Sequence, residues 1–350
     1  MKRVMALVLL LFGVLGVALY SQSPNPRELF LYFPNNLFGF IDQKGSVVIE
    51  PRYEKANDFS EGLAAVKKAE QWGFIDGTGK MIIPLQFMDV PTGFVEGLAA
   101  VKIGNSYGYI DKTGTISITC GYTNAGDFAN GVAIIEINGK SGVITKDGSI
   151  KVKPEFTFIG SFADGLAPVT LAENGKYGYI NGEGKIIIAP QYEDAMVFSQ
   201  GLAAVSQQGH WGFINPQGDT VIPFKFEFAD SFSEGLAGVE LDQSWGYVDK
   251  TGNMVIAPRF DTVYPFSEGL AGVAVDELYG FINPKGEWVI EPKFSEALFG
   301  FKSGLALVGL AQEESNPVSA AYIDKKGQPI KTWVYDLEIL SDSVDDPDSD

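Results

Sequence analysis

Glycine recurs along this chain with a period of about 34 residues, and this periodicity limits the possible folds more than any other feature. Three glycines repeat at fixed offsets in eight copies, so 24 of the 41 glycines belong to the pattern. The first glycine usually lies between two aromatic residues, and it occurs at Gly39, Gly73, Gly108, Gly142, Gly178, Gly212, Gly246 and Gly280. The second follows six residues later (Gly45 to Gly286), and the third another 17 or 18 residues on (Gly62 to Gly304). Such a period indicates one small unit copied in tandem, each copy covering the next.

The copy at residues 245–273 shows most clearly what one unit contains. Asp249 to Gly252 form a four-residue turn, because Asp can bond its own backbone and Gly can adopt the left-handed conformation. The β-prone runs Trp245–Val248 and Met254–Ile256 flank this turn and predict a hairpin. The run Leu270–Val273 predicts a third strand, and the eleven residues from Gly269 to Gly280 are enough for this strand, a tight turn and the first strand of the next hairpin, so the first unit begins near Glu28. Each unit is therefore predicted to be a three-stranded antiparallel meander.

The whole repeat region is predicted to be all-β, since no stretch shows helical periodicity that Gly or Pro leaves unbroken. A ninth hairpin is predicted around Ala321, which replaces the first glycine, so the array has about nine units. Closed β-propellers usually have four to eight blades of four strands. Nine three-stranded units favour an open or superhelical stack, with a β-propeller-like closed ring as the alternative.

Three segments are predicted along the chain. Residues 1–23 contain Lys2 and Arg3 followed by the uncharged apolar run 4–20, which is typical of a signal peptide. A membrane anchor through residues 4–20 is the alternative, because seventeen apolar residues are just long enough to span a bilayer. Residues 24–335 form one repeat domain, and residues 336–350 form an acidic disordered tail. The chain is therefore expected to be exported to the periplasm, the cell surface or the exterior.

The charge and the cysteine content exclude some partners and chemistries. The formal net charge is −18, so the surface repels phosphate backbones and nucleic acid is not an expected partner. A membrane is an expected partner only through the N-terminal segment, if that segment is not cleaved. The single cysteine, Cys120, cannot form an intramolecular disulfide and has no second thiol with which to bind a metal.

Candidate catalytic residues are explained better by the repeat than by chemistry. His210 is the only histidine and occupies a hairpin position that Gln71 and Ser244 occupy in other units. Two sets of carboxylates recur at one position per unit, which predicts structural roles in turns: Glu61, Glu96, Glu234 and Glu268, and Asp42, Asp76, Asp111 and Asp249. No catalytic residue, metal ligand or cofactor is therefore predicted.

The one candidate for ligand binding is Trp288. It lies where other units carry small or aliphatic residues, so the repeat does not require it. An exposed Trp is a good anchor in an interface. A packing contact of Trp288 with a neighbouring part of the core is nevertheless the favoured interpretation, and ligand binding is the alternative.

The motifs resemble those of the WG-repeat (KWG-repeat) family of bacterial proteins. The resemblance rests on Trp72-Gly73-Phe74-Ile75-Asp76, on the matching segments that start at Trp211 and Trp245, and on the Glu-Gly-Leu-Ala segments at 61, 96, 234 and 268. It covers about residues 28–330 and implies a β-strand repeat with no catalytic residues. The predicted function is a non-catalytic binding or scaffolding module of the cell envelope or exterior, with a protein or glycan partner. A glycosidase-like hydrolase is the alternative, and it would need two carboxylates facing each other in a pocket.

Overall fold

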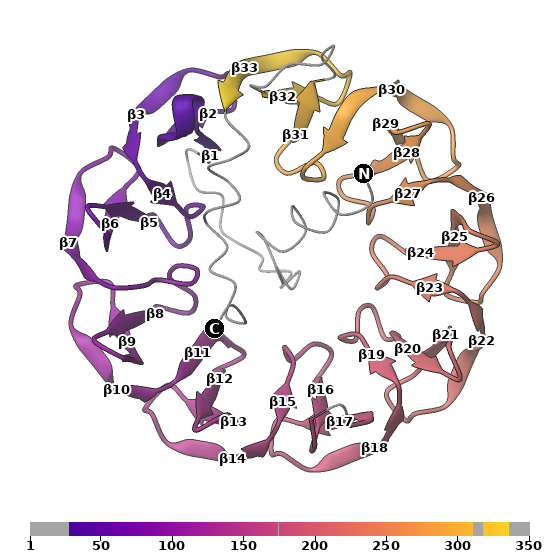
Figure 1. The fold of residues 1–350 in the computed structure, drawn as a ribbon, viewed down its shortest axis with the longest axis horizontal. Coiled ribbons are helices and arrows are strands. Elements are labelled where there is room, and N and C mark those ends of the chain that lie inside the picture. The colour runs from indigo at the N-terminus through magenta and orange to yellow at the C-terminus, as the bar shows by residue number, and fades with distance from the viewer. Residues whose placement is uncertain (1–27, 174, 311–317, 336–350) are drawn as a thin grey trace.

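A computed structural model describes residues 28–173, 175–310 and 318–335, which form a closed ring of nine antiparallel blades (Figure 1). The predicted signal or anchor at 1–23 and the predicted tail at 336–350 lie outside the described residues. All the described secondary structure is β, apart from one 3-10 turn, η1 (Pro34–Asn36). The predicted three-stranded meander is present in every blade, and six blades add a separate fourth strand at the inner edge of the sheet. In the last blade this edge pairs with residues 294–297 at the end of the preceding outer strand, so blades 8 and 9 form one seven-stranded sheet.

The blades follow one another in chain order. The first three comprise β1 (Leu29–Tyr32), β2 (Phe38–Asp42) and β3 (Val47–Tyr53); β4 (Lys55–Ala56), β5 (Leu63–Lys68), β6 (Gln71–Asp76) and β7 (Met81–Phe87); and β8 (Leu98–Ile103), β9 (Ser106–Asp111) and β10 (Ile116–Tyr122). The next three comprise β11 (Asn124–Ala129), β12 (Val132–Ile137), β13 (Lys140–Thr145) and β14 (Ile150–Phe156); β15 (Phe158–Ile159), β16 (Leu166–Thr170), β17 (Tyr177–Asn181) and β18 (Ile186–Tyr192); and β19 (Asp194–Ala195), β20 (Ala203–Gln207), β21 (His210–Ile214) and β22 (Thr220–Phe226). The last three comprise β23 (Phe228–Ala229), β24 (Leu236–Leu241), β25 (Ser244–Asp249) and β26 (Met254–Phe260); β27 (Thr262–Val263), β28 (Ala271–Val275), β29 (Leu278–Ile282) and β30 (Trp288–Ala297); and β31 (Leu305–Leu310), β32 (Val318–Asp324) and β33 (Pro329–Tyr335).

The first glycine of each repeat lies under a bulge of the outermost strand. In blade 7, Trp245 pairs with Phe260 and Tyr247 pairs with Ile256, so three residues of β25 face five of β26. The extra residues cross over Gly246, where a Cβ atom would lie 2.5 Å from the Ile256 carbonyl oxygen. In blade 9, Ala321 replaces this glycine, and β32 pairs with β33 without a bulge at that point. Glycine is therefore required wherever the bulge occurs.

The second glycine forms the joint between neighbouring blades. It ends the Asp-x-x-Gly turn with a positive φ, which is +82° at Gly252, and Asp249 accepts backbone hydrogen bonds from Thr251 and Asn253, as the sequence predicted. A Cβ atom on Gly252 would lie 3.0 Å from Ile222 on the outer strand of the preceding blade. The turn of one blade therefore packs directly on the rim of the blade before it.

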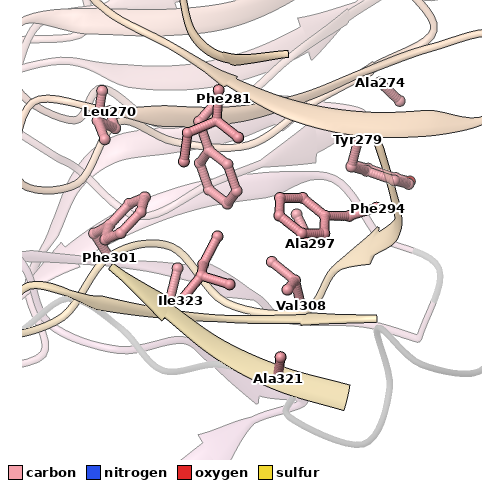
Figure 2. Close-up of a cluster of buried hydrophobic side chains, with 12 residues drawn as sticks. Leu270, Ala274, Tyr279, Phe281, Phe294, Ala297, Phe301, Val308, Ala321 and Ile323 are labelled. Atoms are coloured by element: carbon pink, nitrogen blue, oxygen red, sulfur yellow. The ribbon is translucent and has the colours of Figure 1, made fainter. Parts of the chain in front are cut away.

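Apolar side chains fill the space between the sheets. Between blades 8 and 9, Phe281 and Phe294 meet Val308 and Ile323 in one buried cluster (Figure 2). Phe301, from the loop between β30 and β31, packs its ring 5.0 Å from that of Phe281. Similar clusters lie at the other joints, so the core is divided into layers between the blades rather than gathered at one centre.

The ring closes where blade 9 meets blade 1. Trp333 of β33 packs edge-on against Phe33, with their ring centroids 5.2 Å apart, and Tyr335 packs against the same ring. A Cβ atom on Gly45 would lie 2.7 Å from the Ile330 carbonyl oxygen, so the turn glycine of blade 1 packs on the rim of blade 9. The first and last blades thus form the same joint that the other blades form.

This closure corrects the expectation of an open or superhelical stack, because the structure shows the alternative, a closed ring (Figure 1). The short inner strands, two residues long in β4, β15, β19, β23 and β27, give most blades the four strands typical of propellers. Their length is too small to stand out in the sequence. In addition, the atypical end units cover each other, whereas the end units of an open stack would face water.

Among the described residues, no helix has the length and apolar character needed to cross a membrane.

Candidate functional site

The antiparallel blades give the ring two different faces. The face that we name the turn face carries the Glu-Gly turns before each second strand and the Asp-x-x-Gly turns before each outer strand. The face that we name the hairpin face carries the hairpins at 69–70, 104–105, 138–139, 208–209, 242–243 and 276–277, together with the connections from each outer strand to the next blade. Side chains on the two faces have different tasks.

The turn face holds the blades together. Glu234 and Gly235 both have positive φ, and Ser233 and Leu236 exchange two backbone hydrogen bonds across them. The Glu234 carboxylate accepts a 2.9 Å hydrogen bond from the backbone N–H of Gly269 in the next blade. Equivalent bonds join Glu61 to Gly97, Glu96 to Gly131, Asp164 to Gly201, Gln200 to Gly235 and Glu268 to Gly304. These contacts confirm the turn role predicted for the recurring glutamates.

Lysines strengthen four of these joints. Lys325 of blade 9 lies 3.2 Å from the Glu268 carboxylate and donates a 2.9 Å hydrogen bond to the Glu268 carbonyl oxygen. Lys112, Lys146 and Lys250 donate to the equivalent carbonyl oxygens. At the closing joint, Gln43 of blade 1 donates to the Ser303 carbonyl oxygen at 3.0 Å. The turn face is therefore occupied by bonds of the fold itself.

His210 and Cys120 are far apart in the ring, in blades 6 and 3 (Figure 1). His210 begins β21 on the hairpin face and is exposed. Its Nδ1 atom lies 3.1 Å from the Gln208 carbonyl oxygen in the same hairpin. Cys120 lies in the bulge of β10, where its Sγ would be 2.8 Å from a Cβ atom on Gly108. Burial raises the pKa of the Cys120 thiol. The structure therefore does not bring the two groups together for nucleophilic chemistry.

Trp288 lies at the start of β30 on the outer rim, half-buried. Its indole packs edge-on against Phe260 of the preceding blade, with the ring centroids 5.9 Å apart, and it covers Gly280 of its own blade. This is the packing contact with a neighbouring part of the core that the sequence favoured for this residue. A role for the remaining exposed part of Trp288 in ligand binding stays a prediction.

Three carboxylates depart from the repeat and are largely buried. They are Asp127 in blade 4, Asp230 in blade 7 and Glu296 at the end of β30, where this strand pairs with β31 of blade 9, and burial raises the pKa of each. They lie in different blades, and tyrosines rather than other carboxylates lie near them. Within the described ranges, no three His, Cys, Asp or Glu side chains are grouped so that they could hold a metal ion.

Asp230 allows the effect of burial on a carboxylate and on the stability of the fold to be tested directly. It lies against Gly238, where a Cβ atom would come 3.1 Å from the Asp230 carboxylate, whereas the equivalent residue is Ala65 or Ala204 in other blades. Burial raises the pKa of Asp230 from 3.8 to about 6. Because the folded state holds the proton more tightly than the unfolded state, this group costs stability above pH 6 and ceases to do so as the pH falls towards 4.

We therefore expect Asp230→Asn to raise the free energy of unfolding at pH 7.5 by about 2 to 3 kcal/mol, as a shift of about two pKa units implies. At pH 4.5 the variant and the wild type should differ by much less. Urea denaturation at both pH values measures this, with the exposed-hairpin variant Asp242→Asn as the control. An equal gain at both pH values would contradict the buried-charge explanation.

Among the residues that the structure describes, seventeen large apolar side chains are exposed, and they fall into two groups. Eleven lie on the outer strands, mostly at the two positions before the buried isoleucine or valine that each repeat carries: Met81, Ile82, Ile116, Ile150, Ile186, Ile187, Val221, Met254, Val255, Val289 and Val334. The other six lie on the hairpin face: Leu37, Met88, Ile103, Phe158, Leu171 and Leu278. The first group recurs with the repeat, whereas much of the second does not.

Four members of the hairpin-face group replace polar residues of other blades. Met88 is 60% exposed and occupies the position of Glu54, Thr123, Thr157 or Glu227. Phe158, at 43%, occupies the position of Asn124 or Asp194, and Leu37 and Leu278 occupy that of Ser106 or Ser244. Sequence reasoning missed these residues, although apolar side chains at hairpin positions that are otherwise polar were a visible signal.

The comparison with protein families agrees with this geometry. The WG containing repeat matches eight tandem segments, 38–70, 72–107, 107–140, 142–177, 177–209, 211–243, 245–279 and 279–310. The chain belongs to the WG-repeat family. The boundaries of the WG segments fall at or beside the first glycine of each repeat, so each segment joins the outer two strands of one blade to the inner strands of the next.

One solved structure resembles the WG-repeat ring in fold, and two others are more weakly similar. A structure titled as the eukaryotic initiation factor is similar with a TM-score of 0.63 and 11% identity, covering 89% of this chain and 96% of that one. Hsv2p from Kluyveromyces lactis gives a TM-score of 0.41 at 10% identity, covering 65% and 92%, and virginiamycin B lyase from Staphylococcus aureus gives 0.36 at 17%, covering 71% and 96%. At this identity the first similarity shows the fold alone. None of the curated proteins matches the chain.

Proposed function

We propose that this WG-repeat protein is a non-catalytic binding module that engages a partner protein through its hairpin face. The observation that carries the proposal is the set of exposed apolar side chains at Leu37, Met88, Phe158 and Leu278, at positions that are polar in other blades. Exposed apolar groups that one partner covers together are typical of interaction surfaces. Because these four side chains belong to different blades, the partner is expected to span several blades of the hairpin face. The turn face, by contrast, uses its polar groups for bonds between blades.

We further propose that the module works in the cell envelope or outside the cell. The support is the N-terminal sequence, in which Lys2 and Arg3 precede the uncharged apolar run 4–20. An exported ring of nine blades offers a broad rigid surface for holding a partner, which fits scaffolding as well as binding.

Capture of envelope proteins by the full chain tests the proposal. We expect one or more proteins to bind the wild type, and we expect a variant carrying Leu37→Ser, Met88→Thr, Phe158→Asn and Leu278→Ser to capture at least tenfold less. Each replacement is a residue found at the same position of another blade, so the fold should tolerate it. Mass spectrometry identifies the captured proteins, and a glycan array run alongside tests a glycan partner instead.

The control removes apolar groups of the rim rather than of the hairpin face. The variant Ile82→Ser, Ile187→Ser and Val255→Ser uses the serine that blade 3 carries at Ser117. We expect it to capture partners as the wild type does. Equal loss in both variants, or binding only to glycans, would count against a protein partner on the hairpin face.

A further inference from the structure

The hairpin face of blade 7 combines aromatic rings with carboxylates. Phe228, Glu240 and Trp245 lie side by side across β23, β24 and β25. The Phe228 ring is 4.8 Å from Trp211 of the preceding blade and 5.7 Å from Trp245. Phe228 therefore covers Trp211, whereas the residue at its position in the next blade is Thr262, which has no ring to cover Trp245.

Trp245 is accordingly more open than the other tryptophans of the WG motif. Trp72 and Trp211 are each 7% exposed, while Trp245 is half-buried. Trp245 is the cross-strand partner of Glu240, so an aromatic ring and a carboxylate are presented together.

Blades 2 and 3 show what such a position holds elsewhere in the ring. In blade 3, Lys102 occupies the position of Glu240, and its Nζ atom lies over the Tyr107 ring, 5.3 Å from the centroid. In blade 2, Lys67 occupies this position beside Trp72. In blades 2 and 3 the protein therefore places its own lysine next to the aromatic residue of the WG motif. Blade 7 places the Glu240 carboxylate at the same position.

Most of the charged groups around Trp245 are carboxylates. The two nearby cations belong to the fold: Lys225 and Arg259 lie over the rings of Phe226 and Phe260, and Arg259 also donates to the Gly286 carbonyl oxygen. Six carboxylates lie on the hairpin face of blades 7 and 8: Glu227, Glu240, Asp242, Asp261, Asp276 and Glu277. The segments that form this part of the face (226–228, 240–245, 260–262 and 274–279) contain no Lys or Arg. Of the described Lys and Arg side chains, none forms an ion pair with these six carboxylates. Burial and the neighbouring charge of Glu227 raise the pKa of Glu240, so a cation beside it would be stabilised.

We propose that this patch, formed by Phe228, Trp245 and the six carboxylates, binds Lys or Arg side chains of a basic segment of the partner protein. The inference rests on the proposed function and adds the chemistry of the partner. Ammonium and guanidinium groups are attracted both by the faces of aromatic rings and by carboxylates. The exposed Leu278, at 37%, lies in the same part of the face and offers an apolar contact beside the charges.

Binding of a fluorescein-labelled hexalysine peptide to the full chain tests the site. We expect Glu227→Gln with Glu240→Gln to weaken binding at least tenfold in 50 mM salt, and we expect higher salt to weaken binding to the wild type. The matched control is Glu54→Gln with Glu70→Gln in blade 2, which removes two charges from the same face. Glu54 accepts a hydrogen bond from the hairpin N–H of Ala69, as Glu227 does from Gln243. The control also removes the Lys67–Glu70 ion pair, but Glu70 is exposed and such surface pairs contribute little, so the structural cost is comparable.

The control should weaken binding less than threefold. Tryptophan emission provides a second readout, because the peptide should shift the emission of the wild type and should not shift that of Trp245→Phe. Equal weakening in both pairs, or an emission shift that survives in Trp245→Phe, would overturn the site. If envelope capture depends on Met88 and Phe158 but not on Glu227 and Glu240, the proposed function stands and this inference fails. If hexalysine binds at this patch while no envelope protein is captured, the proposed function fails instead.

Discussion

Gly246→Ala is expected to destabilise the protein by about 3 kcal/mol or more, because the new Cβ atom cannot be accommodated. It would lie 2.5 Å from the Ile256 carbonyl oxygen and 2.8 Å from the Pro258 nitrogen. Both are backbone atoms of the bulge, so relief requires β26 to move as a whole. Such overpacking commonly costs about 1 to 3 kcal/mol and more where the backbone cannot yield. Urea denaturation and amide hydrogen exchange in blade 7 measure the loss.

Gly77→Ala is the matched control for this variant. Gly77 lies in the Asp-x-x-Gly turn of blade 2, has no positive φ, and its nearest contact for a Cβ atom is Leu29 at 3.9 Å. We expect a change of less than about 0.5 kcal/mol there. Equal stability changes in Gly77→Ala and Gly246→Ala would show that the bulge does not require glycine.

Trp333→Ala is expected to cost about 3 to 5 kcal/mol, as truncation of a buried aromatic side chain usually does. Trp333 is 4% exposed and packs against Tyr32, Phe33 and Tyr322 at the joint of blades 9 and 1. No strand is shared across this joint among the described residues. The variant should therefore loosen the ring at this joint before the blades themselves unfold.

Spin labels placed on either side of the joint distinguish loosening from general destabilisation. Cysteines at Gln43 and Ser303, in a Cys120→Ser background, report the distance between blades 1 and 9, because these two residues are hydrogen-bonded across the joint. We expect a longer and broader distance distribution in Trp333→Ala. Trp211→Ala, at the joint of blades 6 and 7, should lose similar stability but leave this distance unchanged. An unchanged distance in Trp333→Ala would contradict its role in closure.

Much of the blade could be predicted from the sequence, because its requirements are local. The turn at Asp249 depends on hydrogen bonds within five residues, and the left-handed conformation of Gly252 depends on the absence of a side chain. Both leave a repeated signature in the residue types. The bulge over Gly246 left a signature too, but the glycine alone did not reveal which strand crosses it.

The closure of the ring could not be predicted in the same way. It depends on the rotation between successive blades, which is set by contacts such as Gly252 against Ile222, and no single residue encodes that angle. The two-residue inner strands were missed for a related reason, since pairs such as Phe228 and Ala229 carry no periodicity.

The candidate sites could not be predicted from the repeat pattern, because their residues lie far apart in the sequence. Glu227 and Glu240 look like ordinary surface residues until the register places them beside Phe228 and Trp245. Trp288 was conspicuous because it breaks the pattern, yet it packs against Phe260. The hairpin face is distinguished by residues that differ from those at the same positions of other blades. These residues come from different strands, and only the three-dimensional arrangement brings them together.

The contact between the first and last blades, which closes the ring without a shared strand, also determines how such a protein unfolds. A linear array of repeats frays from its two ends, where the terminal copies have one neighbour each. In the ring every blade has two neighbours, so melting any single blade uncovers two apolar surfaces at once, and unfolding is expected to be concerted. The aromatic side chains around Trp333 thus make the stability of all nine blades a collective property.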